Sequence, residues 1–404
     1  MANTLTVTDV YGIVNAMNAE MFGNNATITA INTSTFATVA ENMLRTSVTG
    51  TYDALNNVIG KNIYAVRRYN GKFKIILKTA AEWGGITRKI SYFAKPMEQS
   101  TNYNTNLAGT QLDDGSSIDP WVISKKYPLE MCIPGVKSIQ YSITRFVSQI
   151  KMAFTSERAL ADFIAGMLTE VANDIESKIE AENRLMVLNA IGATYNVGNS
   201  RMKVNLRAEF NTKYGTSYSV SDLLTTYLAD FVAFFVWRLK GDMELMSERN
   251  DLFHIYPAKT DDAGNSLTLL RHTPADARRL ILYMPLIRDE EVNVFPSLFD
   301  TSMLRISDFN GVEYWQNPND PMSVSVTPNQ LNTTSGEAET GSAVALSYVV
   351  GLLFDRDALA TEIKHESVLS TPINPRGEYI NTVYHWSQNY LLDQTENMVL
   401  YYLA

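Results

Sequence analysis

The chain has 404 residues, 45% hydrophobic and 19% charged, a composition that excludes a disordered protein and allows two or three folding units. No apolar stretch approaches the roughly 18 residues of a membrane span, and the N-terminus lacks the basic and apolar regions of a secretory signal. The single cysteine, Cys132, excludes an intramolecular disulfide and a cysteine-based metal site. We therefore expect a protein made in a reducing compartment, without a membrane partner.

The first 60 residues are rich in Asn, Thr and Ala and contain only short apolar groups. This composition predicts an extended N-terminal arm that carries one or two short helices. The candidates are residues 36–45, with Thr35 as the N-cap, and residues 54–59. We expect this arm to contact neighbouring copies of the chain.

Residues 61–95 are strongly basic. They hold nine Lys and Arg residues and one acid, Glu82; this gives a net charge of +8 and, since the whole chain carries −9, leaves −17 on the rest. Such asymmetry favours contacts between copies, basic segment on acidic neighbour. A solvated hairpin and a nucleic-acid-binding surface are the alternatives. The candidate inter-subunit contacts are Arg67, Arg68, Lys72, Lys74, Arg88 and Lys89, together with Trp121 further along the chain.

Within this basic segment, Asn70 and Gly71 separate two runs of β-forming residues, 63–69 and 72–79. An Asn-Gly pair in this position favours a two-residue β-hairpin. The sequence therefore predicts two strands joined at Asn70 and Gly71.

The polar segment 96–120 has almost no core-forming side chains. A loop of this length is unusual inside a compact domain. We expect it either to be disordered or to become ordered through contact with another chain. Strand character resumes at residues 121–123 and 131–133 and continues to about Phe146.

Between Glu157 and Ile191 apolar residues recur every three or four positions, and no proline interrupts them. This spacing predicts a helix of about 35 residues and about 50 Å, two to three times the usual length. A coiled coil is the obvious alternative, but apolar residues thin out over 174–183 and break any strict heptad pattern. A long helix that lies across a sheet fits better.

The residues after this helix mix helix and strand. Residues 193–220 are expected to form strand and loop, and residues 221–239 a helix capped by Ser221 or Asp222 that ends before Gly241. Further expected elements are short strands at 252–256, 280–284 and 292–295, a helical turn at 274–279, and a loop of small residues at 318–341.

The C-terminal segment returns to strands, at residues 349–354, 379–390 and 398–403. It is rich in tyrosine and tryptophan, which favours a sheet core with cross-strand aromatic pairs over a carbohydrate- or base-stacking platform. Between two of the strands we expect a turn, because proline presets φ and glycine allows a positive φ. Its residues are Asn374, Pro375, Arg376 and Gly377.

Motifs for catalysis or cofactor binding are missing from the sequence. No phosphate loop, dinucleotide fingerprint, nucleophile elbow, zinc or calcium pattern occurs, and the four histidines have no ligand spacing. The acidic clusters at 289–291 and at Asp355 and Asp357 could serve a hydrolase. Each stands beside an arginine, Arg288 or Arg356, so we expect surface ion pairs. We predict no catalytic residue, no metal and no cofactor.

The order of the segments is more specific than any motif. An Asn/Thr-rich arm, a basic hairpin with a polar loop, a very long helix, an α/β insertion and an aromatic sheet follow one another. In this order the chain resembles the major capsid proteins of tailed bacteriophages, which have the Hong Kong 97-type fold. The last fifty or so residues, including 352–359 and 371–386, resemble the closing strands of such proteins from small short-tailed phages.

The resemblance implies an α+β fold with the segments of that family. These are an N-arm at 1–60, an extended β-hairpin or E-loop region at 61–135, a P domain at 136–220 with a spine helix at about 157–191, an A domain at 221–345 and a return to the P domain at 346–404.

The resemblance also implies a function. Copies of the chain would form hexamers and pentamers that close an icosahedral shell around double-stranded DNA, assembled in the host bacterial cytoplasm and retained in the virion. Portal and scaffolding proteins are the implied partners, and packaged DNA would lie nearby without specific contacts. A tail or collar component is the alternative, although the repeats or coiled coil expected of one are missing. A soluble hydrolase using Asp289, Glu290 and Glu291 is more remote.

Overall fold

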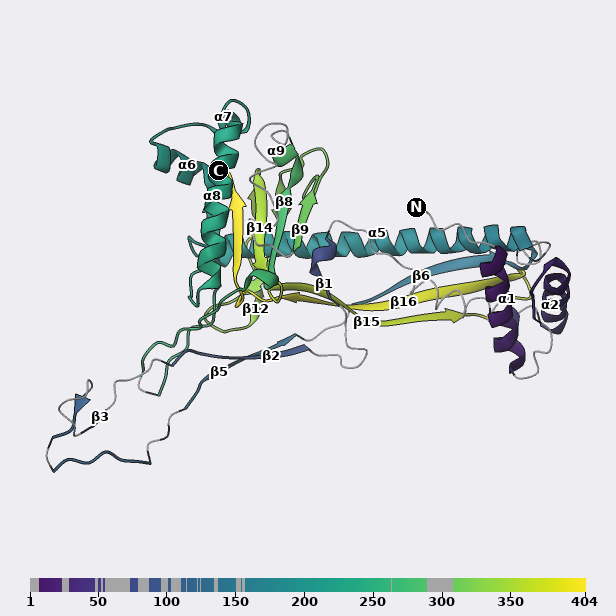
Figure 1. The fold of residues 1–404 in the computed structure, drawn as a ribbon, viewed down its shortest axis with the longest axis horizontal. Coiled ribbons are helices and arrows are strands. Elements are labelled where there is room, and N and C mark those ends of the chain that lie inside the picture. The colour runs from purple at the N-terminus through teal and green to yellow at the C-terminus, as the bar shows by residue number, and fades with distance from the viewer. Residues whose placement is uncertain are drawn as a thin grey trace. The chain divides into compact units, whose positions relative to one another are not determined.

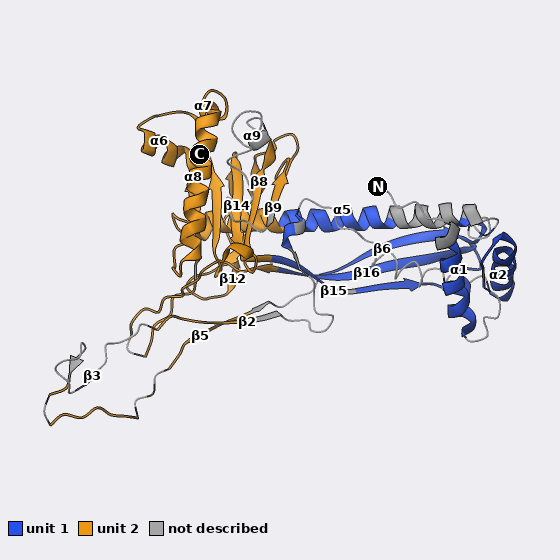
Figure 2. Cartoon of the chain, viewed as in Figure 1, with its two compact units in different colours: residues 1–85, 135–185, 360–390 blue, residues 86–134, 186–359, 391–404 orange. Residues whose placement is uncertain are grey.

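The structure, a computed structural model, divides into two compact units, each built from three segments (Figure 2). Unit 1 comprises Met1–Gly85, Gly135–Leu185 and Ala360–Tyr390, and unit 2 comprises Ile86–Pro134, Met186–Leu359 and Leu391–Ala404. The structure describes residues 7–23, 29–47, 50–51, 54, 73–78, 87–95, 101–102, 110–113, 115–121, 123, 125–133, 137–149, 154, 157–262, 264–288 and 308–404.

The helix expected at 36–45 is confirmed within α2 (Thr33–Thr46), but the described N-terminal residues are more helical than an extended arm, and residues 55–59 of the second expected helix lie outside the described residues. Helix α1 (Val7–Phe22) has 16 residues and helix α2 has 14. Asn32, and not Thr35, is the N-cap of α2; Thr35 completes the capping box from the N3 position. Both helices bury apolar side chains in the unit 1 core, which explains why they persist over several turns.

Unit 1 is organised by one long helix and a four-stranded sheet with the strand order β1-β15-β16-β6 (Figure 1). Strand β6 (Lys137–Phe146) pairs antiparallel with β16 (Tyr379–Leu392) over ten residues. On the other side of β16 lies β15 (Leu359–Ser370), which pairs in parallel with the edge strand β1 (Leu77–Lys78).

The predicted long helix is confirmed and is longer than expected: α5 (Glu157–Val197) has 41 residues. Its unit 1 part lies along the sheet (Figure 1). Val171, Ile175 and Ile179 of α5 share a buried cluster with Ile380 and Tyr384 of β16. The apolar residues that recur every three or four positions in the sequence therefore form the face of the helix that packs on the sheet.

The predicted strand at 72–79 is wrong in its first half. Lys74–Ile76 forms a 3-10 helix, η2, and only Leu77–Lys78 is strand. Phe73 is fully buried, its backbone N–H lies 3.4 Å from Glu180 Oε2, and the Arg184 guanidinium lies over its ring. Packing on α5 fixes the turn here against the local β preference.

Unit 2 contains a five-stranded mixed sheet. Strand β7 (Lys203–Asn205) pairs in parallel with β17 (Met398–Tyr402), which pairs antiparallel with β14 (Val349–Asp355). Strand β14 continues antiparallel to β8 (Arg278–Tyr283), which pairs in parallel with β9 (Asp308–Val312). All seven residues of β14 are buried, as expected for a central strand.

Several expectations for unit 2 are corrected. The helix expected at 221–239 is two helices, α7 (Val220–Leu224) and α8 (Leu228–Ser247), with Ser219 as the N-cap of α7. The break coincides with Tyr227, whose ring stacks on Tyr218 at 4.0 Å. Helix α8 runs through Gly241, since Met243 and Met246 beyond it are buried; this offsets the cost of a mid-helix glycine of roughly 1 kcal/mol.

Short elements fill the rest of unit 2. The predicted strand at 280–284 and the helical turn at 274–279 are confirmed by β8 and by the 3-10 helix η3 (Ala275–Ala277). Residues 252–256 are not a strand, and residues 292–295 lie outside the described residues. Segments expected to be loops contain α6 (Leu206–Tyr214), β10 (Val324–Val326), β11 (Asn329–Leu331) and β12 (Ala338–Thr340); β13 (Val344–Leu346) and α9 (Met284–Arg288) complete the unit.

Candidate functional site

The polar segment of the sequence is enclosed by two paired strands of unit 2. Strand β2 (Thr87–Tyr92) pairs antiparallel with β5 (Pro128–Ile133), from Thr87 opposite Ile133 to Tyr92 opposite Pro128. We call residues 87–133 the ribbon (Figure 1). The hairpin predicted at Asn70 and Gly71 lies outside the described residues. The strand pairing that the structure describes in this part of the chain is that of β2 with β5.

Inside the ribbon, two-residue strands β3 (Thr101–Asn102) and β4 (Thr110–Gln111) pair in parallel. The strand expected at 121–123 is wrong, because Trp121 lies in a turn where its backbone N–H donates to the Asp119 carboxylate at 2.9 Å. An aspartate two residues before such a donor is typical of turns.

The ribbon exposes large apolar side chains. Trp121 is 85% exposed and Ile123 82%, while Ile118 and Tyr92 are more than half exposed. Single exposed apolar residues are ordinary, but Ile118, Trp121 and Ile123 lie within six residues of one another in a segment with little core of its own. Clustered apolar exposure of this kind marks an interaction surface.

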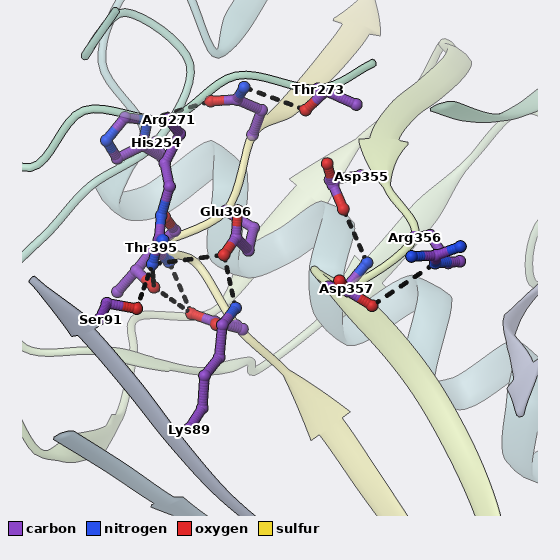
Figure 3. A network of polar contacts seen from close by, with 12 residues as sticks. Lys89, Ser91, His254, Arg271, Thr273, Asp355, Arg356, Asp357, Thr395 and Glu396 are labelled. Carbon is purple, nitrogen blue, oxygen red and sulfur yellow. Dashed lines mark hydrogen bonds and ion pairs between the residues drawn. The ribbon is translucent and has the colours of Figure 1, made fainter. Parts of the chain in front are cut away.

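Lys89 fastens the ribbon to the C-terminal segment of unit 2 (Figure 3). Its Nζ lies 2.5 Å from Asp393 Oδ2 and 2.5 Å from Glu396 Oε1. The Asp393 side chain is fully buried and that of Glu396 is 10% exposed, whereas that of Lys89 is 26% exposed. One ammonium thus pairs with two carboxylates that would be costly to bury alone.

Arg271, which forms an isolated β-bridge with Asn250, adds a second attachment (Figure 3). Its guanidinium donates to Ser91 Oγ on β2 at 2.8 Å and to the Thr395 carbonyl at 2.9 Å, and lies 3.3 Å from Glu396 Oε1. Thr395 in turn donates from its backbone N–H and hydroxyl to Asp393 at 2.9 and 2.6 Å. We call Lys89, Arg271, Asp393, Thr395 and Glu396 the anchor.

Contacts in the anchor shift the pKa values of Lys89 and Glu396. Burial lowers the pKa of the Lys89 ammonium, but the carboxylates of Asp393 and Glu396 more than offset this, so the pKa lies above its ordinary value. Burial raises the pKa of Glu396, and the positive charges of Lys89 and Arg271 compensate only in part. Lys89 therefore stays charged at neutral pH.

The other predicted contacts are described only in part. Arg67, Arg68 and Lys72 lie outside the described residues, and the side chains of Lys74 and Arg88 do as well, although Lys74 begins η2 and Arg88 stands opposite Cys132 in β2. Lys89 contacts carboxylates of its own chain, so the inter-subunit contact predicted for it remains a prediction. The sequence does not predict the roles of Asp393, Glu396 and Arg271, since no local pattern links them to residue 89.

The turn between β15 and β16 forms at the predicted residues but for a different reason. Asn374 accepts the Arg376 N–H and the Glu378 N–H at 2.9 Å each, through its side chain and its carbonyl. The positive φ, 47°, belongs to Glu378 and not to Gly377. Gly377 is required for space instead, because a Cβ there would lie 2.5 Å from the ring of Tyr379.

The described acidic and aromatic clusters have structural roles. Asp355 is buried and accepts the Asp357 N–H at 2.8 Å, while Arg356 and Asp357 form a half-exposed pair at 3.7 Å. Tyr384 and Trp386 belong to the buried core of unit 1, which supports the sheet-core interpretation. Asp289, Glu290 and Glu291 lie outside the described residues.

The described part of the chain shows neither a metal-binding cluster nor a membrane-spanning helix. No group of three or more His, Cys, Asp or Glu side chains there could hold a metal ion. Among the described helices, none combines the length and apolar character needed to cross a bilayer.

Two features are typical of a structural protein that assembles through extended contacts: the long helix, and the ribbon with its exposed apolar residues. Sequence comparison identifies the family: over residues 14–402 the chain matches the Phi29-like phage major capsid proteins, and it belongs to that family. No curated protein sequence matches it.

Solved structures of phage capsids resemble the chain at low identity. The capsid of Staphylococcus phage Andhra has 11% identity and a TM-score of 0.48, covering 84% of each chain. The mature capsid of bacteriophage PhiM1 has 12% and 0.44, covering 83% of this chain and 88% of that one. The capsid of Cyanophage P-SCSP1u has 12% and 0.43, covering 82% and 86%.

Family membership confirms the main expectation. The chain is a phage major capsid protein, a component of the virion that assembles into an oligomeric shell. The expected α+β fold class is confirmed by the mixture of helices and sheets in both units. The alternative of a tail or collar component is thereby set aside.

Proposed function

We propose that the ribbon is the E-loop of this capsid protein and that its apolar side chains seal the contact with the neighbouring subunit. The observation that carries this is the exposure of Trp121 and Ile123, 85% and 82%, on a segment held by the anchor. Burying a large apolar side chain contributes roughly 1.5–3 kcal/mol. Repeated across a shell, such contacts sum to a stable assembly.

The rest of the proposal follows from the family. The subunits form hexamers and pentamers that close an icosahedral shell around double-stranded DNA. Assembly takes place in the host bacterial cytoplasm, with portal and scaffolding proteins as partners, and the shell protein has a mechanical and not a catalytic role. The N-terminal segment, the E-loop, the P domain and the A domain divide the labour as in the Hong Kong 97-type arrangement, with the boundaries given above.

Paired substitutions test the role of the ribbon. The variant Trp121→Ser with Ile123→Ser removes apolar surface that the isolated subunit exposes, so its thermal unfolding should match that of the unchanged chain. Shell formation, scored by negative-stain electron microscopy and by sedimentation, should fall at least tenfold. Normal shells from the variant would contradict the proposal.

A matched control keeps this test specific. Leu185 is also exposed, 56%, but lies on α5 and not on the ribbon. Leu185→Ser also removes exposed apolar surface, from a single side chain, and should assemble like the unchanged chain. Equal loss of shells from both variants would mean that exposed apolar surface in general, and not the ribbon, drives assembly.

A further inference from the structure

Unit 2 contains an open groove that neither the ribbon nor the anchor uses. It lies between α6 and α8, and its volume is about 700 Å³. Pockets of roughly 300–1,000 Å³ are large enough for a specific ligand or an inserted side chain. The residues that decide its character are Arg201, Glu209, Lys213, Phe234, Trp237 and Arg238.

The wall of the groove is apolar and aromatic. Phe234 is buried and packs edge-on against Phe210 at 5.4 Å, while Trp237 on the same helix is 56% exposed. The Lys213 ammonium lies 3.1 Å from the centre of the Trp237 ring. An exposed indole beside a cation is a combination frequent at the energetic centre of protein interfaces.

The charge of the groove is only partly balanced by the described residues. Arg238 is neutralised, because its Nε lies 2.7 Å from Glu209 Oε2 and its guanidinium also pairs with the buried Asp242. Arg201 and Lys213 have no carboxylate partner among the described residues. The groove therefore presents two cations beside apolar surface.

The ribbon has the complementary composition. Residues 111–123 contain three aspartates, at positions 113, 114 and 119, and no lysine or arginine. The same segment exposes Ile118, Trp121 and Ile123. It thus combines negative charge with apolar side chains over a short length, which matches the groove in both respects.

We propose that residues 111–123 of one subunit dock in the α6–α8 groove of a second copy of the chain. The aspartates face Arg201 and Lys213, and an apolar side chain of the segment packs on Trp237. This inference rests on the proposed role of the ribbon and adds the surface that receives it. A single strand of nucleic acid could also use two cations and an indole, but the chain itself supplies an acidic apolar segment in every subunit of a shell.

Charge reversal with second-site compensation tests the contact in the full-length chain. Arg201→Glu with Lys213→Glu, and separately Asp113→Lys with Asp119→Lys, should each lower the yield of shells at least tenfold while the circular dichroism spectrum and Tm stay unchanged. Combining all four substitutions should restore most of the yield. The charge-matched control, Lys240→Glu with Arg249→Glu, should assemble normally.

Mixing the two doubly substituted chains tests whether docking is between copies. Each variant carries the surface that fits the other, so a tagged groove variant should retain the ribbon variant on a resin, whereas neither retains itself. The proposal would be overturned if the groove variant did not retain the ribbon variant, or if the chain with all four substitutions stayed unassembled.

The outcomes separate this inference from the proposed function. If Trp121→Ser with Ile123→Ser abolishes shells while the groove variant assembles normally, the ribbon role stands and the groove is wrong. If a single-stranded oligonucleotide binds the unassembled chain, binding is lost in the groove variant and the fourfold variant does not assemble, the groove is a nucleic-acid site instead.

Discussion

Lys89 is the residue on which the position of the ribbon depends most. Its ammonium is the shared partner of Asp393 and Glu396, two side chains that are buried or nearly so. Arg271 also reaches Glu396, and Thr395 also serves Asp393. The carboxylates are thus well supplied with donors, but Lys89 alone joins both of them to β2 by ion pairs in the described structure.

Replacing Lys89 by methionine should loosen the ribbon. Removing one partner of a buried ion pair costs roughly 3–5 kcal/mol, and because other donors to the carboxylates remain, we expect a loss of about 3 kcal/mol. Urea unfolding of the full chain measures the loss, and limited proteolysis should show earlier cleavage within residues 93–127. Lys126→Met, at an exposed ribbon position, is the control and should change neither result.

The loss at Lys89→Met should also depend on pH. Burial already raises the pKa of the Glu396 carboxyl, and losing the Lys89 ammonium should raise that pKa further. A carboxyl with a raised pKa stabilises the fold below its unfolded-state pKa and loses this contribution as the pH rises through the folded-state pKa. The destabilisation should therefore be largest at neutral pH and shrink toward pH 5. A loss that is constant over this range would contradict the role of Glu396.

At the scale of elements, the sequence predicts what is periodic. Helix α5 follows from its three-to-four spacing, and β16 from alternation that the structure shows as regular burial of every second residue. The errors arise where a distant contact overrides local preference. Phe73 is held on α5, and Met243 and Met246 carry α8 past Gly241.

One part of the candidate site can be predicted from the sequence and another part cannot. Trp121 is predictable, because a tryptophan in a polar segment without a core has little to pack against in its own chain. The anchor is not predictable, because Lys89 and Asp393 are 304 positions apart and neither belongs to a motif. Only the folded arrangement, in which 391–404 joins the same unit as 86–134, brings them together.

The turn between β15 and β16 offers a test of an element. Gly377→Ala would place a methyl group against the ring of Tyr379, whose hydroxyl accepts from the Asn374 side chain at 2.9 Å. Overpacking of this kind costs about 1–3 kcal/mol. We expect a lower Tm for Gly377→Ala than for the unchanged chain, measured by calorimetry. The control is Gly241→Ala, where a Cβ meets nothing within 4 Å and which should stabilise α8.

At the scale of the whole molecule, each unit is assembled from three segments of the chain. Contacts between residues far apart in sequence dominate such an arrangement, so folding is expected to be slow relative to that of a helical bundle. A chain that exposes the ribbon before its partners arrive also carries an apolar segment open to wrong contacts. Acidic residues within 111–123 limit this hazard, because like charges keep free copies of the segment apart.

The distribution of charge leads to the last prediction. Residues 61–95 carry +8 and the remainder −17, within a total of −9. Reversing Arg67, Arg68, Lys72 and Lys74 to glutamate lowers the net charge of this segment from +8 to zero, and we expect a folded subunit that no longer forms shells. The unchanged chain should assemble less well at 1 M salt, where the Debye length is about 3 Å, than at 0.1 M, where it is about 10 Å. Electron microscopy and light scattering measure both effects. Salts that are excluded from the protein surface strengthen apolar contacts. Two results together would therefore contradict the role of charge: better assembly at 1 M salt, and shells from the reversed variant. They would show that apolar burial on the ribbon drives assembly.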